Sequence, residues 1–150
     1  GHFEDVTSAA GHGFQVLLSS RGCAFADYDN DGDVDILITN MDAPPTLLRN
    51  DGGVQGNWLI VGLEGTISNR AGIASIVRVK TGNLIQMREV RSGNSYVSQN
   101  DLRTHFGLGD FEHIDEIEVR WPSGQLSKLT DISARQILKI VEPKTVIQRN

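Results

Sequence analysis

A nine-residue acidic segment restricts the structures open to this 150-residue chain more than any other feature: Asp27-Tyr28-Asp29-Asn30-Asp31-Gly32-Asp33-Val34-Asp35. Aspartates at relative positions 1, 3, 5 and 9, with glycine at position 6, suit a calcium loop. Ca²⁺ takes roughly six to eight oxygen ligands, which a tight loop supplies at alternate residues, and glycine tolerates the positive φ of the turn. Without a counter-ion the carboxylates would repel one another. The alternative is a solvated acidic turn. The candidate metal residues are Asp27, Asp29, Asp31, Asp33 and Asp35.

The residues beside this segment favour strands over helices. An EF-hand needs a helix on each side of its loop and a bidentate glutamate at position 12, but position 12 here is Ile38. Ile38 lies in residues 35–40, a short run rich in branched apolar side chains that is typical of a strand. Residues 23–26 contain no helix start signal. We therefore expect the acidic loop to connect two strands.

Charge and glycine content indicate two all-β parts. Residues 1–56 carry nine acids and two bases, a net of −7, whereas residues 57–150 carry ten acids and twelve bases, a net of +2. The change falls in the glycine-rich residues 51–56, which are typical of a linker or sharp turn. The predicted domains are residues 1–56 and 57–150. An acidic first part and a second part without a basic run disfavour nucleic-acid binding.

The first part is predicted to form four short strands, because apolar runs alternate with turn residues. Four strands with a metal loop in one connection are similar to one blade of a β-propeller. The predicted strands are Gln15–Ser19, Gly22–Ala26, Asp35–Asn40 and Thr46–Arg49.

The second part is predicted to be a compact β-sandwich or barrel. Gly82-Asn83 suits a two-residue hairpin turn, and apolar and charged residues alternate over 117–121, as in a strand with one buried face. Pro122-Ser123-Gly124 indicates the next turn. The predicted strands here include Ile76–Lys80, Leu84–Val90, Gln125–Leu129 and Gln136–Glu142, with a short helical turn over Asp131–Ala134.

Both parts resemble known families. The first resembles the FG-GAP/VCBS repeat in Phe3-Glu4-Asp5-Val6-Thr7, in residues 25–35 and in Arg49-Asn50-Asp51-Gly52-Gly53. The second resembles the ASPIC/UnbV domain of the cartilage acidic protein-like family, in seven blocks that include Ser68-Asn69-Arg70-Ala71-Gly72-Ile73, Tyr96-Val97-Ser98-Gln99-Asn100-Asp101 and Val119-Arg120-Trp121-Pro122-Ser123-Gly124. The resemblance implies that Asp27, Asp29, Asp31 and Asp35 bind Ca²⁺ through their side chains, and Asp33 through its backbone carbonyl. It also implies an extracytoplasmic location, secreted or on the cell surface.

Catalytic interpretations find less support in the sequence. Ser95, Asp101 and His105 have the residue types of a hydrolase triad but no nucleophile elbow. The four histidines show no paired metal spacing, so we expect His105 to be a structural hydrogen-bonding residue. Cys23 is the single cysteine, so an internal disulfide is impossible, and a buried, unreactive thiol is expected.

The loop at residues 94–103 is the candidate ligand surface, because binding residues concentrate in loops. The alternative is a hydrogen-bonded loop that packs with Trp121. Trp58 and Trp121 lie in apolar strand contexts and are expected in the core, not as sugar platforms. The candidate ligand-binding residues are Tyr96, Gln99, Asn100, Asp101 and Arg103.

The sequence thus predicts a non-catalytic, adhesion-type interaction module in which calcium rigidifies the first part. The alternative is a metal-dependent hydrolase that uses the acidic loop. No apolar run approaches the ~18 residues of a membrane span, and no signal peptide is visible, although Gly1-His2 is typical of a cloning scar. The partner is an unknown protein or carbohydrate. Because one blade has exposed edges, we expect it to pack on its own second domain or on a partner chain. A homodimer is one such arrangement, and a monomeric mass in light scattering would count against it.

Overall fold

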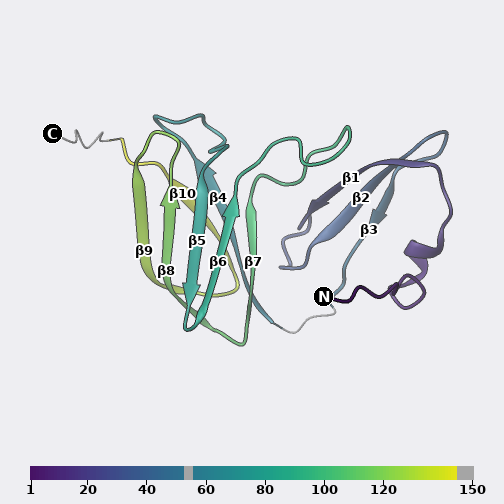
Figure 1. Ribbon diagram of the computed structural model, residues 1–150, viewed down its shortest axis with the longest axis horizontal. Coiled ribbons are helices and arrows are strands. Elements are labelled where there is room, and N and C mark those ends of the chain that lie inside the picture. The colour runs from purple at the N-terminus through teal and green to yellow at the C-terminus, as the bar shows by residue number, and fades with distance from the viewer. Residues whose placement is uncertain (53–55, 145–150) are drawn as a thin grey trace.

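The computed structural model describes residues 1–52 and 56–144 as an all-β chain with one short 3₁₀ helix (Figure 1). The elements form a small sheet on one side and a larger two-sheet body on the other. In chain order they are η1 (His12–Gln15), β1 (Ser20–Ala26), β2 (Asp35–Asn40), β3 (Thr46–Leu48), β4 (Asn57–Glu64), β5 (Ile76–Thr81), β6 (Leu84–Glu89), β7 (Thr104–Gly109), β8 (His113–Arg120), β9 (Leu126–Ser133) and β10 (Gln136–Val141).

The larger body is a sandwich of two sheets. One has the order β10-β4-β7, with β10 parallel to β4 and β7 antiparallel to it, and the other is antiparallel with the order β6-β5-β8-β9. Both sheets supply the buried apolar cluster between them, which contains Leu59, Val61, Phe106, Leu108 and Ile140 from the first and Val77, Val79, Ile114, Ile117 and Val119 from the second. Trp121 joins this core, as predicted. The sandwich therefore resolves the predicted choice between sandwich and barrel.

The small sheet contains three strands in the order β1-β2-β3, all antiparallel. The prediction of four strands is wrong, because residues 16–19 are irregular and Gln15 ends η1. Leu17 is 95% exposed, so its side chain does not pack against the small sheet. The acidic loop connects β1 to β2, as the sequence predicts.

Three further details of the sequence prediction change. The strand β9 continues to Ser133, so the expected helical turn over residues 131–134 is wrong: Asp131 has φ of 55° within a strand paired to β8. Cys23 is half-buried, not fully buried, because the small sheet has little covering its faces. The hairpin around Gly82-Asn83 is confirmed, since Thr81 pairs with Leu84.

Side chains on β4 and β7 alternate between the two sides of their sheet, and this alternation positions the site. Leu59 on β4 and Phe106 on β7 are paired and point into the sandwich core. Their neighbours Ile60 and His105, also paired, point to the opposite face. Ile60 is nevertheless only 2% exposed, because the acidic loop and β1 cover that face.

Candidate metal site and its junction with the sandwich

Three carboxylates of the acidic loop converge. One oxygen each from Asp27, Asp29 and Asp35 lies within 4.8 Å of the others. Oxygens bound to one Ca²⁺ at about 2.4 Å can be no further apart than about 5 Å, so the three fit a shared ion. Asp27 and Asp35 are 3% and 2% exposed, whereas Asp29 is exposed. The arrangement is open on the Asp29 side, where water could complete the coordination shell.

Backbone amides hold the loop in this shape. Asp27 Oδ2 accepts a hydrogen bond from Gly32 N (2.9 Å), and its Oδ1 accepts one from Asp31 N (3.2 Å). The Asp35 carboxylate accepts hydrogen bonds from two backbone amides, Tyr28 N (3.1 Å) and Asn50 N (2.8 Å). The loop is thus folded around its first and last aspartates.

The other two predicted ligands take different positions. Asp31 Oδ1 accepts a hydrogen bond from Asp33 N (2.9 Å), and neither side chain joins the group of three. In the resemblance Asp33 contributes a backbone carbonyl, which does not require its carboxylate at the ion. The structure therefore brings together three of the five predicted metal residues by their side chains.

The electrostatics of the loop favour a cation. Burial raises the pKa of Asp29, and repulsion from Asp31, Asp35 and Asp27 raises it further. Burial and then the charges of Asp31 and Asp27 raise the pKa of Asp33 as well. A raised carboxyl pKa means that the ionised form lacks compensating positive charge, which a divalent cation would supply.

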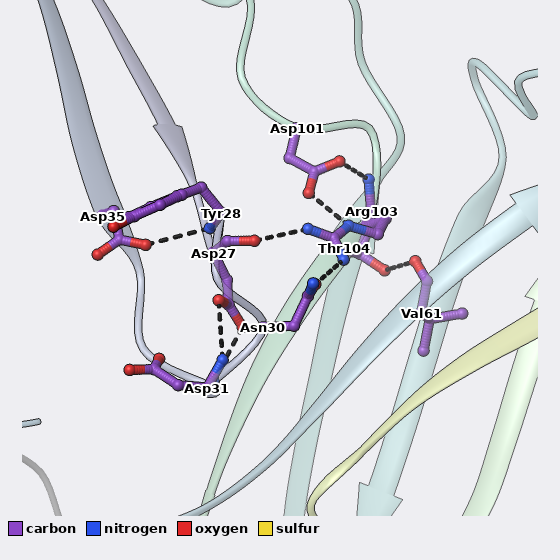
Figure 2. Close-up of polar contacts among 10 residues, drawn as sticks. Asp27, Tyr28, Asn30, Asp31, Asp35, Val61, Asp101, Arg103 and Thr104 are labelled. Carbon is purple, nitrogen blue, oxygen red and sulfur yellow. Dashed lines mark hydrogen bonds and ion pairs between the residues drawn. The ribbon is translucent and has the colours of Figure 1, made fainter. Parts of the chain in front are cut away.

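Arg103 joins the acidic loop to the sandwich (Figure 2). Its Nη2 donates to the Asp27 carbonyl (2.7 Å) and its Nη1 to Asn30 Oδ1 (2.7 Å). Asp101 fixes the guanidinium by accepting from Nε (2.5 Å) and from the Arg103 backbone N (3.0 Å). Because a guanidinium presents its donors in a fixed fork, this arginine contacts the loop at two points, one backbone carbonyl and one side-chain amide oxygen.

Gly32 packs closely against the sandwich. Its φ is 101°, in the region that favours glycine, and a Cβ there would lie 2.0 Å from Nε1 of Trp58. On β7, His105 Nε2 lies 2.7 Å from the Gly32 carbonyl oxygen. A carbonyl only accepts hydrogen bonds, so Nε2 carries the proton. His105 is a hydrogen-bonding residue as predicted, whereas Trp58 packs on the acidic loop and not in the core.

The 94–103 loop, between β6 and β7, reaches across to β1 (Figure 1). Asn100 Oδ1 accepts from Phe25 N (3.1 Å), and Asp101 N donates to the Phe25 carbonyl (3.0 Å), so this loop pairs with β1 much as a strand would. Ser98 Oγ donates to the Cys23 carbonyl (2.9 Å). The loop packs against the small sheet, not against Trp121 as the sequence alternative held.

The five candidate ligand residues separate in the structure. Asn100, Asp101 and Arg103 line a cavity at the junction, and Gln99 lines a second, mostly apolar one over β1, β2 and β3. Tyr96 is 71% exposed and lines neither.

The residues of the hypothetical triad are each engaged elsewhere. Asp101 is paired with Arg103, and His105 binds the Gly32 carbonyl. Ser95 forms a bridge with Ser98 in the 94–103 loop. The side chains of Asp101 and His105 are therefore both committed to the junction.

A buried carboxylate, which the sequence analysis did not single out, lies at the far end of the sandwich. Glu142 follows β10 and is 1% exposed. Its Oε2 accepts hydrogen bonds from the backbone N of Thr66, Ile67 and Ser68 (2.8, 2.8 and 2.7 Å). Its Oε1 accepts from the hydroxyls of Ser68 (2.8 Å) and Ser123 (2.5 Å). The only sequence signal was a glutamate at the end of the predicted strand over residues 136–142.

The fold and the acidic loop together define an all-β module in which a β-sandwich contacts a small sheet through the acidic loop. Residues 65–147, more than half of the chain, match the family described as ASPIC and UnbV, and the chain belongs to this family.

The chain is also similar to cartilage acidic protein 1 from three vertebrates. It is 27% identical over 128 residues to the protein of Homo sapiens and to that of Mus musculus, across 82% of this chain but 19% and 20% of theirs. It is 29% identical over 108 residues to the Xenopus tropicalis protein, across 70% of this chain and 16% of that one. The chain therefore spans about a fifth of the length of these curated relatives.

Proposed function

We propose that this chain is a non-catalytic, extracytoplasmic calcium-binding interaction module. In this proposal Ca²⁺ orders the acidic loop and thereby fixes the small sheet against the sandwich. The supporting observation is the double role of Asp27: its carboxylate belongs to the group of three, while its carbonyl accepts the hydrogen bond of Arg103. A cation that positions Asp27 therefore also positions the acceptor that the sandwich uses.

The same proposal assigns a family resemblance to each of the two parts of the chain. We treat residues 1–56 as an FG-GAP/VCBS-like repeat, which the strand-to-strand position of the acidic loop supports, and residues 57–150 as the ASPIC/UnbV-like domain. The relatives named as cartilage acidic proteins support an extracytoplasmic location. The described residues include no helix with the length and hydropathy that a membrane crossing requires.

Calcium should stabilise the protein measurably. A single site of this kind, without a bidentate glutamate, should bind with a Kd of about 10⁻⁴ to 10⁻³ M. At millimolar calcium and a Kd of ~10⁻⁴ M the free energy of unfolding rises by about 1.4 kcal/mol, which is a melting-temperature increase of about 3 to 6 °C for a chain of this size. Thermal melts in calcium and in chelator measure the difference.

Substitutions test whether the calcium effect depends on the three converging carboxylates or only on the total negative charge. Asp35→Asn should abolish the calcium shift, because Asp35 supplies one of the three converging oxygens. Asp42→Asn is the matched control: Asp42 is an exposed aspartate in the connection between β2 and β3, outside the acidic loop. If wild type melts at the same temperature in calcium and in chelator, the structural role of the metal is wrong.

One observation favours assembly as a second function. The small sheet leaves large apolar side chains in solvent, among them Phe25 (42%), Leu37 (44%) and Leu47 (49%). Exposed apolar patches of this kind mark contact surfaces. The proposal is therefore that this apolar surface contacts a second copy of the chain or a partner chain. A molar mass measured at high concentration tests the dimer.

A further inference from the structure

The junction between the small sheet and the sandwich contains a cavity of about 240 Å³ that opens to solvent. Both parts contribute to its wall, and cavities between structural units are common ligand sites. The size suits a small molecule or one side chain of a larger partner. Its apolar wall includes Phe25, Val34, Ile60 and Leu102, and its polar wall includes Arg88 and Asn94.

Most of the charge in this wall is already paired. Arg103 pairs with Asp101 at 2.5 Å, and Arg91 pairs with Glu89 at 2.5 Å. Among the described residues, no carboxylate forms an ion pair with Arg88. Arg88 is therefore the one arginine of this wall that lacks an anion.

The remaining acid of the wall does not offset Arg88. Both carboxylate oxygens of Asp27 accept hydrogen bonds from backbone amides, those of Asp31 and Gly32, and the side chain forms no ion pair with Arg88. In the proposed calcium-bound state that carboxylate would also face the cation. The net electrostatic preference of the cavity is therefore for a single negative charge.

The Arg88 guanidinium is also held in place. Its Cζ lies 5.6 Å from the ring centroid of Phe106, within cation–π range, and Nη1 donates to the Met87 carbonyl (3.0 Å). A guanidinium has five N–H donors, so one backbone acceptor leaves most of them for another group. A planar, positioned fork of donors matches a carboxylate.

We propose that this cavity binds one carboxylate carried on a short apolar stem, with Arg88 as its anion-binding residue. The stem packs on Val34 and Ile60, and the side-chain amide of Asn94 stands beside the charged end as a second donor. The inference rests on the proposed interaction function, because it names the chemistry that the module recognises. The carboxylate belongs either to a free small acid or to an acidic side chain of a protein partner.

Titration of the ¹⁵N-labelled protein, followed by NMR in calcium buffer, tests this inference. The probes are butyrate and the terminally blocked peptide Gly-Glu-Gly, each beside its neutral amide: butyramide and blocked Gly-Gln-Gly. We expect saturable shifts for the acids at the amides of residues 88–94 and 100–105, and none for the neutral probes. Butyrate that binds as tightly as the peptide indicates a free acid, and a clearly tighter peptide indicates a protein side chain.

Variants assign the contact to one residue. Arg88→Gln should weaken binding of the acids about 10- to 100-fold, the usual effect of losing a charged hydrogen-bond partner, and Arg88→Lys should retain part of it. Arg120→Gln is the matched control, because Arg120 is an exposed arginine of β8 outside the cavity wall. Thermal melts confirm that the variants remain folded.

Two results overturn the inference. One is the absence of saturable binding by either acid. The other is binding of the acids that Arg88→Gln leaves unchanged. This includes binding that requires calcium but not Arg88, because the ligand carboxylate would then be bound by the metal ion. The calcium melts described above are unaffected by either result, so failure of the cavity proposal is distinguishable from failure of the calcium proposal.

Discussion

Replacing Gly32 by alanine should separate the small sheet from the sandwich while the sandwich stays folded. Alanine at φ of 101° is strained by about 1 to 3 kcal/mol, and its Cβ would overlap the Trp58 indole, which at comparable overpacked sites costs about 1 to 3 kcal/mol. The contact cannot be kept at that cost, so the indole becomes exposed to solvent. A red shift of tryptophan emission with an intact β-sheet circular dichroism spectrum measures this result, since Trp121 stays in the core.

The matched control for this prediction is Gly11→Ala. Gly11 has nearly the same φ, 107°, but a Cβ there would meet no atom within 4 Å. The Gly11→Ala variant therefore has the backbone strain without the steric clash, and its tryptophan emission spectrum should match that of wild type. Arg103→Met is a complementary variant, because it removes the hydrogen bonds to Asp27 and Asn30 and adds no atom beside Trp58. Wild-type emission from both Gly32→Ala and Arg103→Met would contradict the junction.

Replacing Glu142 by glutamine should have the largest effect on the sandwich itself. The buried carboxylate accepts five hydrogen bonds that tie β10 to the 66–68 loop and to Ser123. Burial alone would raise the pKa of this carboxyl, but the hydrogen bonds from Ser123, Ser68 and Ile67 outweigh it and lower the pKa to about 2. Loss of the charge should cost about 2 to 3 kcal/mol, measured by urea unfolding at pH 7. Glu112→Gln, at an exposed position, is the control.

The same carboxylate sets a pH dependence with a defined sign. The pKa of Glu142 is about 2 in the folded protein against an ordinary value of 4.5. A lowered folded-state pKa means that the unfolded chain binds the proton first as pH falls. The stability from Glu142 is therefore complete above about pH 4.5 and is lost as the pH falls toward 2. Subtracting the Glu142→Gln profile from wild type isolates this component, and a flat difference between pH 6 and 2 would refute the role of the carboxylate.

The local patterns in the sequence predicted the local structure well. Alternation over residues 117–121, the Gly82-Asn83 turn and the branched apolar run after Asp35 all correspond to elements of the structure, because each depends on neighbouring residues. The failures have non-local causes. Residues 16–19 are apolar enough for a strand but belong to no sheet, and Ile132 and Ser133 are held in a strand by pairing with β8.

The candidate site likewise has a part that local sequence predicts and a part that depends on tertiary contacts. The aspartate spacing alone indicated a metal loop between two strands, and Gly32 was expected at its turn. The sequence could not show that Trp58, Arg103 and His105 converge on that loop, because they lie 26 to 73 residues from Gly32 and Asn30 and meet them only through the pairing of β4 with β7. Nor could it show that Arg88 is left without an anion.

By itself, the sequence determined the composition of the loop, the all-β character and most strands, since spacing, periodicity and turn residues act over a few positions. The tertiary structure alone decided what the loop is attached to. Alternation along β4 and β7 sends Leu59 and Phe106 into the core, and it directs Ile60 and His105 to the outer face, where the acidic loop is bound. The junction depends on how β4, β7 and the acidic loop are placed relative to one another, and the local sequence of any one of these segments does not specify that placement.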